Sequence, residues 1–382
     1  MGKEITKIIG HQLFFAKPSV WFALLGRNSI DLRYWHKAFL IYLITLLTYP
    51  LQLIQKLLYK KKVKAIDLNE KPPVFILGHW RSGTTHLHYI LHQDPQFGTL
   101  SNYQAFLFNV ALLSRTSLKW ILGPLMPPTR PQDNTAFDLN KPAEEEQPFC
   151  TMSTRTGFHS WHFPKNQSYF RKYNLFEGIS PKEKRAWQRA YTFCLQNISF
   201  FNNGKQLVLK NPHNTGRVNE LLELFPDSKF VFIHRDPVEV FISTRHLYLS
   251  MVSSQFLNET SPEAIEELIF DYYKSVIGKY LRDRDNIPKG NLIELSYHKL
   301  KSNPFEEVER IYKELDLPHY LAARRSIKKY LNSTKRFKTN RYENLDPELK
   351  ARILKEFHFQ ELEKFHSEDL REVEQQEYST VS

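Results

Sequence analysis

Cysteine is scarce in this sequence, because the 382 residues include two, Cys150 and Cys194. Two cysteines exclude a disulfide framework and a metal site built from several thiolates. Free thiols are usual in reducing compartments, so the sequence predicts a cytoplasmic protein. The first thirty residues also lack the basic start, apolar run and small-residue cleavage site of a signal peptide.

Acidic residues are outnumbered as well: 53 Lys and Arg stand against 41 Asp and Glu, a net charge of +12. This excess favours an anionic partner, such as a nucleotide, a nucleic acid or an acidic membrane surface, although a solvated basic surface has the same composition. Zinc-finger spacing and RGG or RS runs are absent from the sequence. We therefore expect no nucleic-acid partner.

One long apolar run, "AFLIYLITLLTYPLQLIQKLL" (38–58), lies near the N-terminus. Its uncharged part, from Ala38 to Gln55, has the minimum length for crossing a bilayer, and Pro50 and several polar side chains weaken that interpretation. Lys56 and the cluster "KKKVK" follow it. The pattern leaves three alternatives open: a helix on the membrane interface, a spanning helix, or an ordinary buried helix. In the first two, residues 38–64 contact a membrane, and the basic cluster lies beside anionic headgroups and keeps the chain that follows on the cytoplasmic side.

After residue 70 the pattern changes to short apolar runs that each end at a turn and lead into a helical segment. The runs lack polar alternation, which indicates strands buried on both faces. We predict an α/β fold in which a P-loop-like parallel β-sheet is flanked by helices, with the apolar helix N-terminal to it. Ligands bind such sheets at the carboxyl ends of the strands. The predicted strands are residues 73–78, 206–210, 229–234 and 291–297.

These patterns predict two regions: an N-terminal helical segment, 1–70, that is a candidate for membrane association, and a catalytic domain, 71–382. Residues 127–149 are rich in proline and turn formers. A long ordered loop of this kind suits a lid over the ends of the strands.

The stretch "GHWRSGTT" has the outline of a phosphate-binding loop, in which Gly78 and Gly83 have the required spacing. Thr84 replaces the lysine of ATP- and GTP-binding loops, and the cation is Arg81. Backbone N–H groups from Arg81 to His86 remain able to surround an anion. Because the sequence also lacks an evident acidic residue for Mg²⁺, we expect a 5′-phosphosulfate rather than a triphosphate, and no metal.

A second anion site is predicted where "FVFIHRDPVEVFISTRH" turns from a strand into a helix. Arg235 stands at the end of the strand, and Ser243 follows about two helical turns later. Together they suit a second phosphate, so the donor has the pattern of an adenosine 3′,5′-bisphosphate. Asp236, beside Pro237, is predicted to cap the helix instead.

The order strand–"RSGTT" and then strand–"RDP"–x₅–Ser resembles the sulfotransferases that use 3′-phosphoadenosine 5′-phosphosulfate (PAPS). The similarity is to the branch with arginine in the first loop, which includes bacterial sulfotransferases and is distantly similar to the tyrosylprotein enzymes. It covers roughly residues 73–345. The resemblance implies that Arg235 and Ser243 hold the 3′-phosphate. It also implies that the 5′-phosphosulfate is held by Arg81, Ser82, Gly83, Thr84, Thr85 and His86.

The same resemblance implies that Lys210, at the end of "QLVLK", stabilises the transition state. The acceptor hydroxyl also needs a base. The acidic position of the tyrosylprotein branch is Asn102 here, which is unable to serve. His213, near Lys210, is one candidate, and Glu146 in "PAEEE" is another. Glu144, Glu145 and His79 remain open as well.

We therefore expect a PAPS-dependent sulfotransferase acting on a hydroxyl. The apolar N-terminal run and an aromatic content of 14% favour an amphipathic, small-molecule acceptor such as a sterol or another lipid-like alcohol. A P-loop kinase of small molecules, or a non-catalytic nucleotide-binding protein at a membrane, remain as alternatives.

Overall fold

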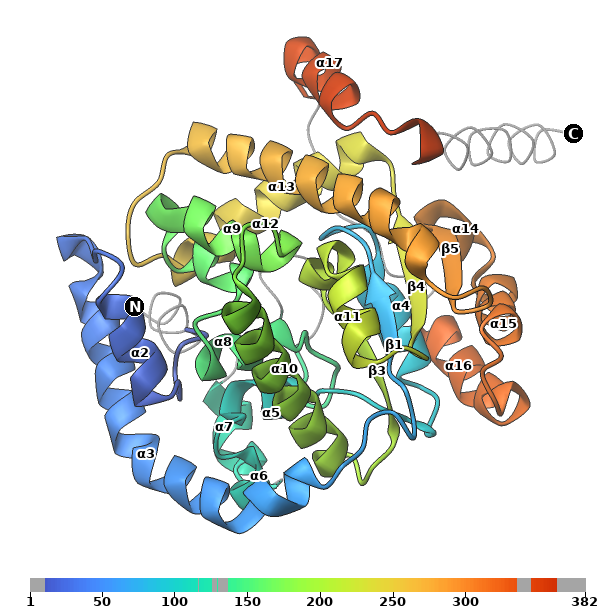
Figure 1. Cartoon of the computed structure of the whole chain (residues 1–382). Coiled ribbons are helices and arrows are strands. Elements are labelled where there is room, and N and C mark those ends of the chain that lie inside the picture. The colour runs from blue at the N-terminus through green and yellow to red at the C-terminus, as the bar shows by residue number, and fades with distance from the viewer. Residues whose placement is uncertain (1–10, 116, 126–128, 130–136, 335–344, 363–382) are drawn as a thin grey trace, which may run out of the picture. The chain divides into compact units, whose positions relative to one another are not determined.

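A computed structural model describes residues 11–115, 117–125, 129, 137–334 and 345–362 (Figure 1). The chain divides into two compact units, which are described separately. The first takes in residues up to 73 together with 96–209 and 246–265, and the second takes in 74–95, 210–245 and the chain from 266 onward.

The described residues form five strands, β1 to β5, in one sheet with the order β2-β3-β1-β4-β5. Neighbouring strands that belong to the same unit pair in parallel. In the second unit Val74 of β1 pairs with Lys229 of β4, and Phe230 of β4 pairs with Leu292 of β5. In the first unit Phe97 of β2 pairs with Gln206 of β3. The α/β fold predicted from the sequence is confirmed, with β2 as the one described strand that the pattern did not reveal.

The first unit is mainly helical. Aromatic packing fills it: the ring of Trp187 stacks on Tyr191 with centroids 4.7 Å apart, and Phe149 meets Tyr191 edge-on. Its elements are α2 (Pro18–Leu25), η1 (Leu32–Tyr34), α3 (Trp35–Lys64), β2 (Phe97–Gly98), α5 (Asn102–Leu107), α6 (Ala111–Ser114), α7 (Lys119–Leu122), η2 (Gly123–Leu125), α8 (Glu146–Met152), η3 (Gly157–Trp161), η4 (Pro164–Asn166), α9 (Gln167–Leu175), α10 (Pro181–Phe201) and η6 (Val252–Gln255).

The second unit is built around β4, whose apolar side chains are buried on both faces. Phe232 stacks on Tyr280 at 3.9 Å, which packs a helix onto the strand. Its elements are β1 (Val74–Leu77), α4 (Thr84–Leu91), η5 (Pro212–Gly216), α11 (Val218–Leu224), β4 (Lys229–His234), η7 (Arg284–Asn286), β5 (Leu292–Ser296), α14 (Tyr297–Ser302), α15 (Pro304–Glu314), α16 (Tyr320–Thr334) and α17 (Pro347–Glu356). Three elements cross the boundary between the units: β3 (Gln206–Lys210), α12 (Pro237–Ser250) and α13 (Pro262–Asp283).

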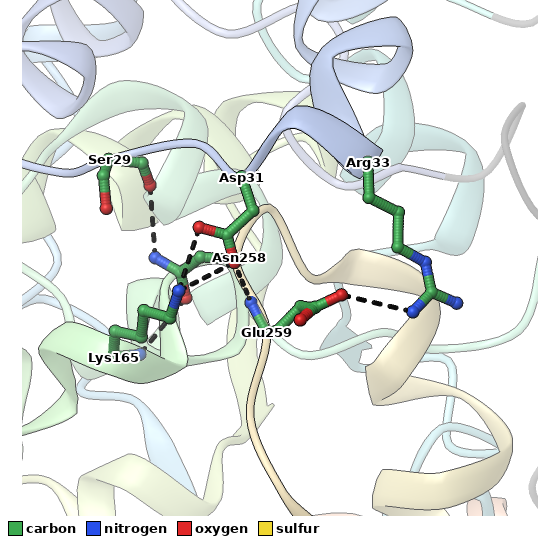
Figure 2. A network of polar contacts seen from close by, with 6 residues as sticks. All are labelled: Ser29, Asp31, Arg33, Lys165, Asn258 and Glu259. Atoms are coloured by element: carbon green, nitrogen blue, oxygen red, sulfur yellow. Dashed lines mark hydrogen bonds and ion pairs between the residues drawn. The ribbon is translucent and has the colours of Figure 1, made fainter.

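The chain between α2 and α3 is held by a polar network within the first unit (Figure 2). Asp31 accepts hydrogen bonds from Lys165 Nζ and from the backbone N–H of Glu259, at 2.8 Å and 2.7 Å. The bond from Lys165 is the main reason that the pKa of the Asp31 carboxyl is lowered. Asn258 donates to the carbonyl of Ser29, and Arg33 pairs with Glu259 at 3.3 Å. These contacts secure the N-terminal end of α3.

The predicted domain boundary at residue 70 stays a prediction. So does the candidate lid, 127–149, of which residues 127–128 and 130–136 lie outside the described residues. The described residues 137–145 lead into α8. Before that helix begins, the backbone N–H of Ala143 donates a hydrogen bond to the carbonyl of Leu100.

Candidate active site

The loop between β1 and α4 has a backbone that requires glycine at two points. Gly78 and Gly83 have φ angles of 138° and 96°. A Cβ atom at Gly83 would lie 2.2 Å from the ring of Tyr297, and one at Gly78 would lie 2.4 Å from the carbonyl oxygen of Ile233. Arg81 also adopts a left-handed conformation, with φ 69°, although it is not glycine. The loop is therefore a tightly constrained turn, as the glycine spacing predicted.

The predicted 5′-anion residues all lie on this turn and on the start of α4. The N–H of His86 bonds to the carbonyl of Gly83 at 3.0 Å, which begins the helix. The first N–H groups of a helix lack intrahelical acceptors and carry its partial positive charge, so they attract an anion. Ser82 and Thr84 are buried, and Thr85 is half-buried. Burial lowers the pKa of the His86 imidazole, so this side chain is neutral near pH 7.

The two predicted anion sites meet at Arg81. Its Nε donates a 2.7 Å hydrogen bond to Oγ of Ser243 in α12. Arg235, at the end of β4, donates from Nη1 to the carbonyl of Arg81 at 3.2 Å, and its guanidinium lies 4.5 Å from the ring centroid of Tyr297. The sequence placed Ser243 beside Arg235; in the structure Ser243 contacts Arg81, and Arg235 contacts the same loop.

Two acidic residues lie close to Arg235 in the chain, Asp236 and Glu239. Asp236 Oδ1 accepts the N–H of Glu239 at 2.9 Å, so its predicted role as a helix cap is confirmed. Arg235 Nε also donates to the carboxylate of Glu239 at 2.5 Å. The Glu239 side chain is 55% exposed, so a phosphate that binds Arg235 competes with a solvated carboxylate rather than a buried one.

Lys210 and His213 lie at the end of β3 and in the turn that follows it. Lys210 is the last residue of β3 and is buried. Asn211 Oδ1 accepts a hydrogen bond from the N–H of His213, which begins η5. His213 is fully buried. Its Nδ1 lies 3.3 Å from the hydroxyl of Tyr272. The imidazole is therefore part of the interior of the second unit and not a surface group.

Aromatic rings surround His213. Trp80 meets it edge-on with centroids 5.1 Å apart, and Trp80 in turn stacks on Tyr272 at 4.2 Å. His79 packs at 5.1 Å from Tyr273, and burial lowers its pKa to about 4. Sequence reasoning missed Trp80 and Tyr272, because the two residues are far apart in the chain and Trp80 has no assigned role within the loop motif.

The candidate glutamates belong to the first unit. Glu146 is the first residue of α8, is fully buried and accepts a 2.5 Å hydrogen bond from Thr156 Oγ1. Glu145 is also fully buried and accepts from the Tyr191 hydroxyl at 2.9 Å. Desolvation raises the pKa of Glu145 to about 7. Three glutamates in a row suggest a solvated stretch, so the sequence contained no sign of this burial.

No cluster of three or more His, Cys, Asp or Glu side chains suited to a metal ion occurs in the part of the chain that the structure describes. The candidate site in the second unit consists of an arginine-containing anion loop, a second arginine, a buried lysine and a histidine enclosed by aromatic rings.

A glycine-constrained loop without the nucleotide-kinase lysine, at the end of a central parallel strand, is the arrangement expected of a group-transfer enzyme of the P-loop type. Residues 72–320 match the sulfotransferase family, and the chain belongs to it. It is an enzyme, a sulfotransferase, as the resemblance predicted. This membership leaves the kinase and the non-catalytic alternatives without support.

Individual relatives agree. The chain is 28% identical over 327 residues to the omega-hydroxy-beta-dihydromenaquinone-9 sulfotransferase Stf3 of Mycobacterium bovis and of Mycobacterium tuberculosis, covering 85% of this chain and 84% of theirs. Among solved structures, sulfotransferase STF1 from Mycobacterium tuberculosis is 17% identical with a TM-score of 0.58, over 88% of this chain and 90% of that one. Sulfotransferase STF9 from Mycobacterium avium is 20% identical with a TM-score of 0.59, over 80% of both chains. These structures share the fold.

Proposed function

We propose that this sulfotransferase takes its sulfuryl group from PAPS and transfers it to the hydroxyl of a lipid-like alcohol. The main observation in support of PAPS as the donor is that Ser243 and Arg235 both contact Arg81. Its side chain bonds to Ser243, its carbonyl accepts from Arg235, and its own backbone forms the turn before α4. One loop thereby brings the residues suited to two anionic groups into a single site.

In this proposal each anionic end of the donor has its own residues. The N-terminal N–H groups of α4 and the side chains of Arg81, Ser82, Thr84, Thr85 and His86 hold the 5′-phosphosulfate, and Gly83 permits the turn. Arg235 and Ser243 hold the 3′-phosphate. Guanidinium groups form charge-assisted hydrogen bonds that suit the 3′-phosphate. Backbone N–H groups at the start of a helix suit the 5′-phosphosulfate.

The reaction is the attack of the acceptor oxygen on sulfur. A new O–S bond forms, the S–O bond to the 5′-phosphate breaks, and adenosine 3′,5′-bisphosphate leaves with the electron pair. Lys210 is proposed to stabilise the negative charge on that leaving oxygen. The acceptor's proton passes to a base, for which we propose His213, because it lies three residues from Lys210 in the same unit. Glu146 and Glu145 are the alternatives.

The acceptor is proposed to be amphipathic, with a sterol or another lipid-like alcohol favoured. The name of the Mycobacterium relative supports this, since omega-hydroxy-beta-dihydromenaquinone-9 carries its hydroxyl on a lipid-like molecule. The identity of 28% supports the class of acceptor and not that molecule itself. We also propose that the enzyme works on the cytoplasmic side of a membrane.

The test is incubation of the protein with sulfur-labelled PAPS and, in parallel, extracts of lipids, glycans and phenols, followed by mass spectrometry of labelled products. We expect label in an alcohol of the lipid extract, and roughly 10- to 100-fold slower labelling with the Arg81→Ala variant at subsaturating PAPS. Label that appears only in glycans or phenols would contradict the lipid acceptor. Nucleotide that binds without any transfer, from all three extracts, would contradict the proposed reaction.

A further inference from the structure

Helix α3 has its polarity reversed relative to an ordinary helix on the surface of a protein. Such a helix buries an apolar stripe and exposes polar residues. The buried residues of α3 are Ala38, Ile41, Thr45, Gln52, Gln55 and Val63. Half of them, Thr45, Gln52 and Gln55, are polar. The exposed positions are mostly large and apolar, and they include Trp35, Phe39, Tyr42, Leu43, Leu46, Leu47, Leu53, Ile54, Leu57 and Leu58.

Two of the three buried polar side chains, Gln52 and Gln55, are hydrogen-bonded into the protein, which fixes the orientation of the helix. Gln52 Nε2 donates to the carbonyl of Ala16 at 3.2 Å. Gln55 Nε2 donates to the carbonyl of Phe108 at 3.0 Å, and its Oε1 accepts the N–H of Leu112 at 2.7 Å. Rotating the helix to bury its leucines would break these bonds and leave buried groups without partners, which is costly. The apolar face is therefore held outward.

We propose that this outward face of α3, referred to below as the α3 apolar face, docks the protein on an anionic lipid bilayer, with the helix in the plane of the membrane. Helices of this length with a large apolar face and lysines lie in the boundary between headgroups and acyl chains. The face is far larger than a scattered surface leucine: Phe39, Leu47 and Leu57 are 64, 69 and 82% exposed. A contiguous apolar surface of this kind marks an interaction site.

The charge on α3 points to lipid headgroups rather than to another apolar protein surface. Its 30 residues include six lysines and no acidic residue. Lys56, Lys60, Lys61, Lys62 and Lys64 are exposed at its C-terminal end. A basic cluster beside an apolar face is attracted to anionic lipids. In a symmetric contact between two copies of the chain, the same lysines would repel each other wherever they approached.

The packing of α3 favours a position on the membrane rather than across it. By length and composition, the stretch Leu32–Lys64 is the one helix among the described residues that is long and apolar enough to span. However, its buried stripe runs from Ala38 to Val63, and the helix packs against α2, α6 and α10 within the first unit (Figure 1). A spanning helix would carry that packed protein into the hydrocarbon. The network around Asp31 also holds its N-terminal end against the first unit (Figure 2).

The test is sedimentation of the full-length protein with vesicles, without donor or acceptor, so that its outcome is independent of the proposed reaction. Vesicles of neutral phosphatidylcholine are compared with vesicles containing phosphatidylglycerol. We expect binding to the anionic vesicles, and a loss of at least about tenfold in partitioning for the variant Leu47→Glu/Leu57→Glu. Lys60→Gln/Lys61→Gln/Lys62→Gln should weaken binding to anionic vesicles and reduce its salt dependence.

The matched control is Leu321→Glu, which places the same charge on an exposed leucine of α16, 80% exposed, in the second unit. It should bind vesicles as the unmodified protein does. Circular dichroism confirms that each variant is folded. Failure of the unmodified protein to bind anionic vesicles would overturn the proposal. So would a dimer in light scattering that Leu47→Glu/Leu57→Glu dissociates, because the face would then bind a second copy.

Discussion

The guanidinium of Arg81 donates a hydrogen bond from Nε to Oγ of Ser243, across 162 positions of the sequence. This bond joins the loop after β1 to the helix after β4, the two segments that the motif analysis treated as separate anion sites. Because Arg235 also donates to the carbonyl of Arg81, the two motifs form one structural unit. Their contributions to donor binding should therefore depend on each other.

The first prediction concerns donor affinity. A charged hydrogen bond to phosphate contributes about 1.5–3 kcal/mol, so Arg81→Ala and Arg235→Ala should each bind adenosine 3′,5′-bisphosphate roughly 10- to 100-fold more weakly. Ser243→Ala should cost less, and Arg81→Ala/Ser243→Ala should lose less than the sum of the single effects, since each residue orders the other. Calorimetry measures all of these affinities. Arg245→Ala, also in α12, removes a half-buried ion pair with Glu266 outside the proposed donor site and should bind normally. Native affinity in Arg235→Ala would remove its assignment to the 3′-phosphate.

The second prediction concerns Gly83. Its φ of 96° is unfavourable for alanine, and the new methyl group would meet the ring of Tyr297. Gly83→Ala should therefore lose donor binding and lower the free energy of unfolding by more than about 1–3 kcal/mol. Gly290→Ala is the control: its φ is 82°, and no atom of the described residues lies within 4 Å of the added Cβ. It isolates the backbone strain from the steric clash. Equal loss of stability in the two variants would show that Tyr297 yields without cost.

The third prediction concerns the base. A positioned base contributes about 10²–10⁴-fold to the rate, so His213→Ala should lose at least about 10²-fold in turnover while it keeps nucleotide affinity. Glu146→Gln and Glu145→Gln preserve shape and remove charge. If either is inactive while His213→Ala is nearly normal, the base is a glutamate at the N-terminal end of α8. In that case a base with the pKa of Glu145, about 7, should make turnover rise as pH increases through that value.

The fourth prediction concerns stability in acid and rests on three buried histidines of the first unit. Nδ1 of His159 lies 3.2 Å from Nδ1 of His162, and the ring of His162 stacks on His11 at 5.4 Å. Desolvation lowers the pKa of His11 to about 3 and of His159 to about 4, and lowers that of His162 well below its usual range. All three are neutral in the folded protein at pH values where the unfolded chain has bound protons. Their contribution is fully present above pH 6.5 and is lost as pH falls toward 4.

Glu145 acts in the opposite direction. Its pKa is raised to about 7, so between pH 4.5 and 7 the folded protein binds a proton there that the unfolded chain releases. The buried histidines with lowered pKa values outnumber this one glutamate, and His79 of the second unit acts in the same direction as the other three. The free energy of unfolding should therefore fall as pH decreases from 6 to 4.5. Denaturant titrations across this range measure the slope. His36→Gln, at an exposed histidine on α3, should leave it unchanged, whereas a flat profile would mean that these buried groups titrate normally.

Local sequence determined the parts of this protein whose interactions are near neighbours in the chain. The strand, turn and helix around "RSGTT" follow from an apolar run, two glycines and a helix start, and the cap at Asp236 follows from its place before Pro237. Such patterns specify backbone conformation because the bonds that they form lie within a few residues. They were enough to predict the parallel sheet apart from β2, the glycine-constrained turn and the family.

Only the tertiary structure decided which distant side chains meet. Ser243 was expected beside Arg235 and contacts Arg81, because the direction of a helical side chain depends on how the helix packs on the sheet. The burial of His213 beneath Trp80 and Tyr272, and of Glu145 beside Tyr191, depends on contacts between segments that no local pattern relates. For α3 the sequence left three environments open. Its composition specified a helix, and only the hydrogen bonds of Gln52 and Gln55 determined which face turns outward.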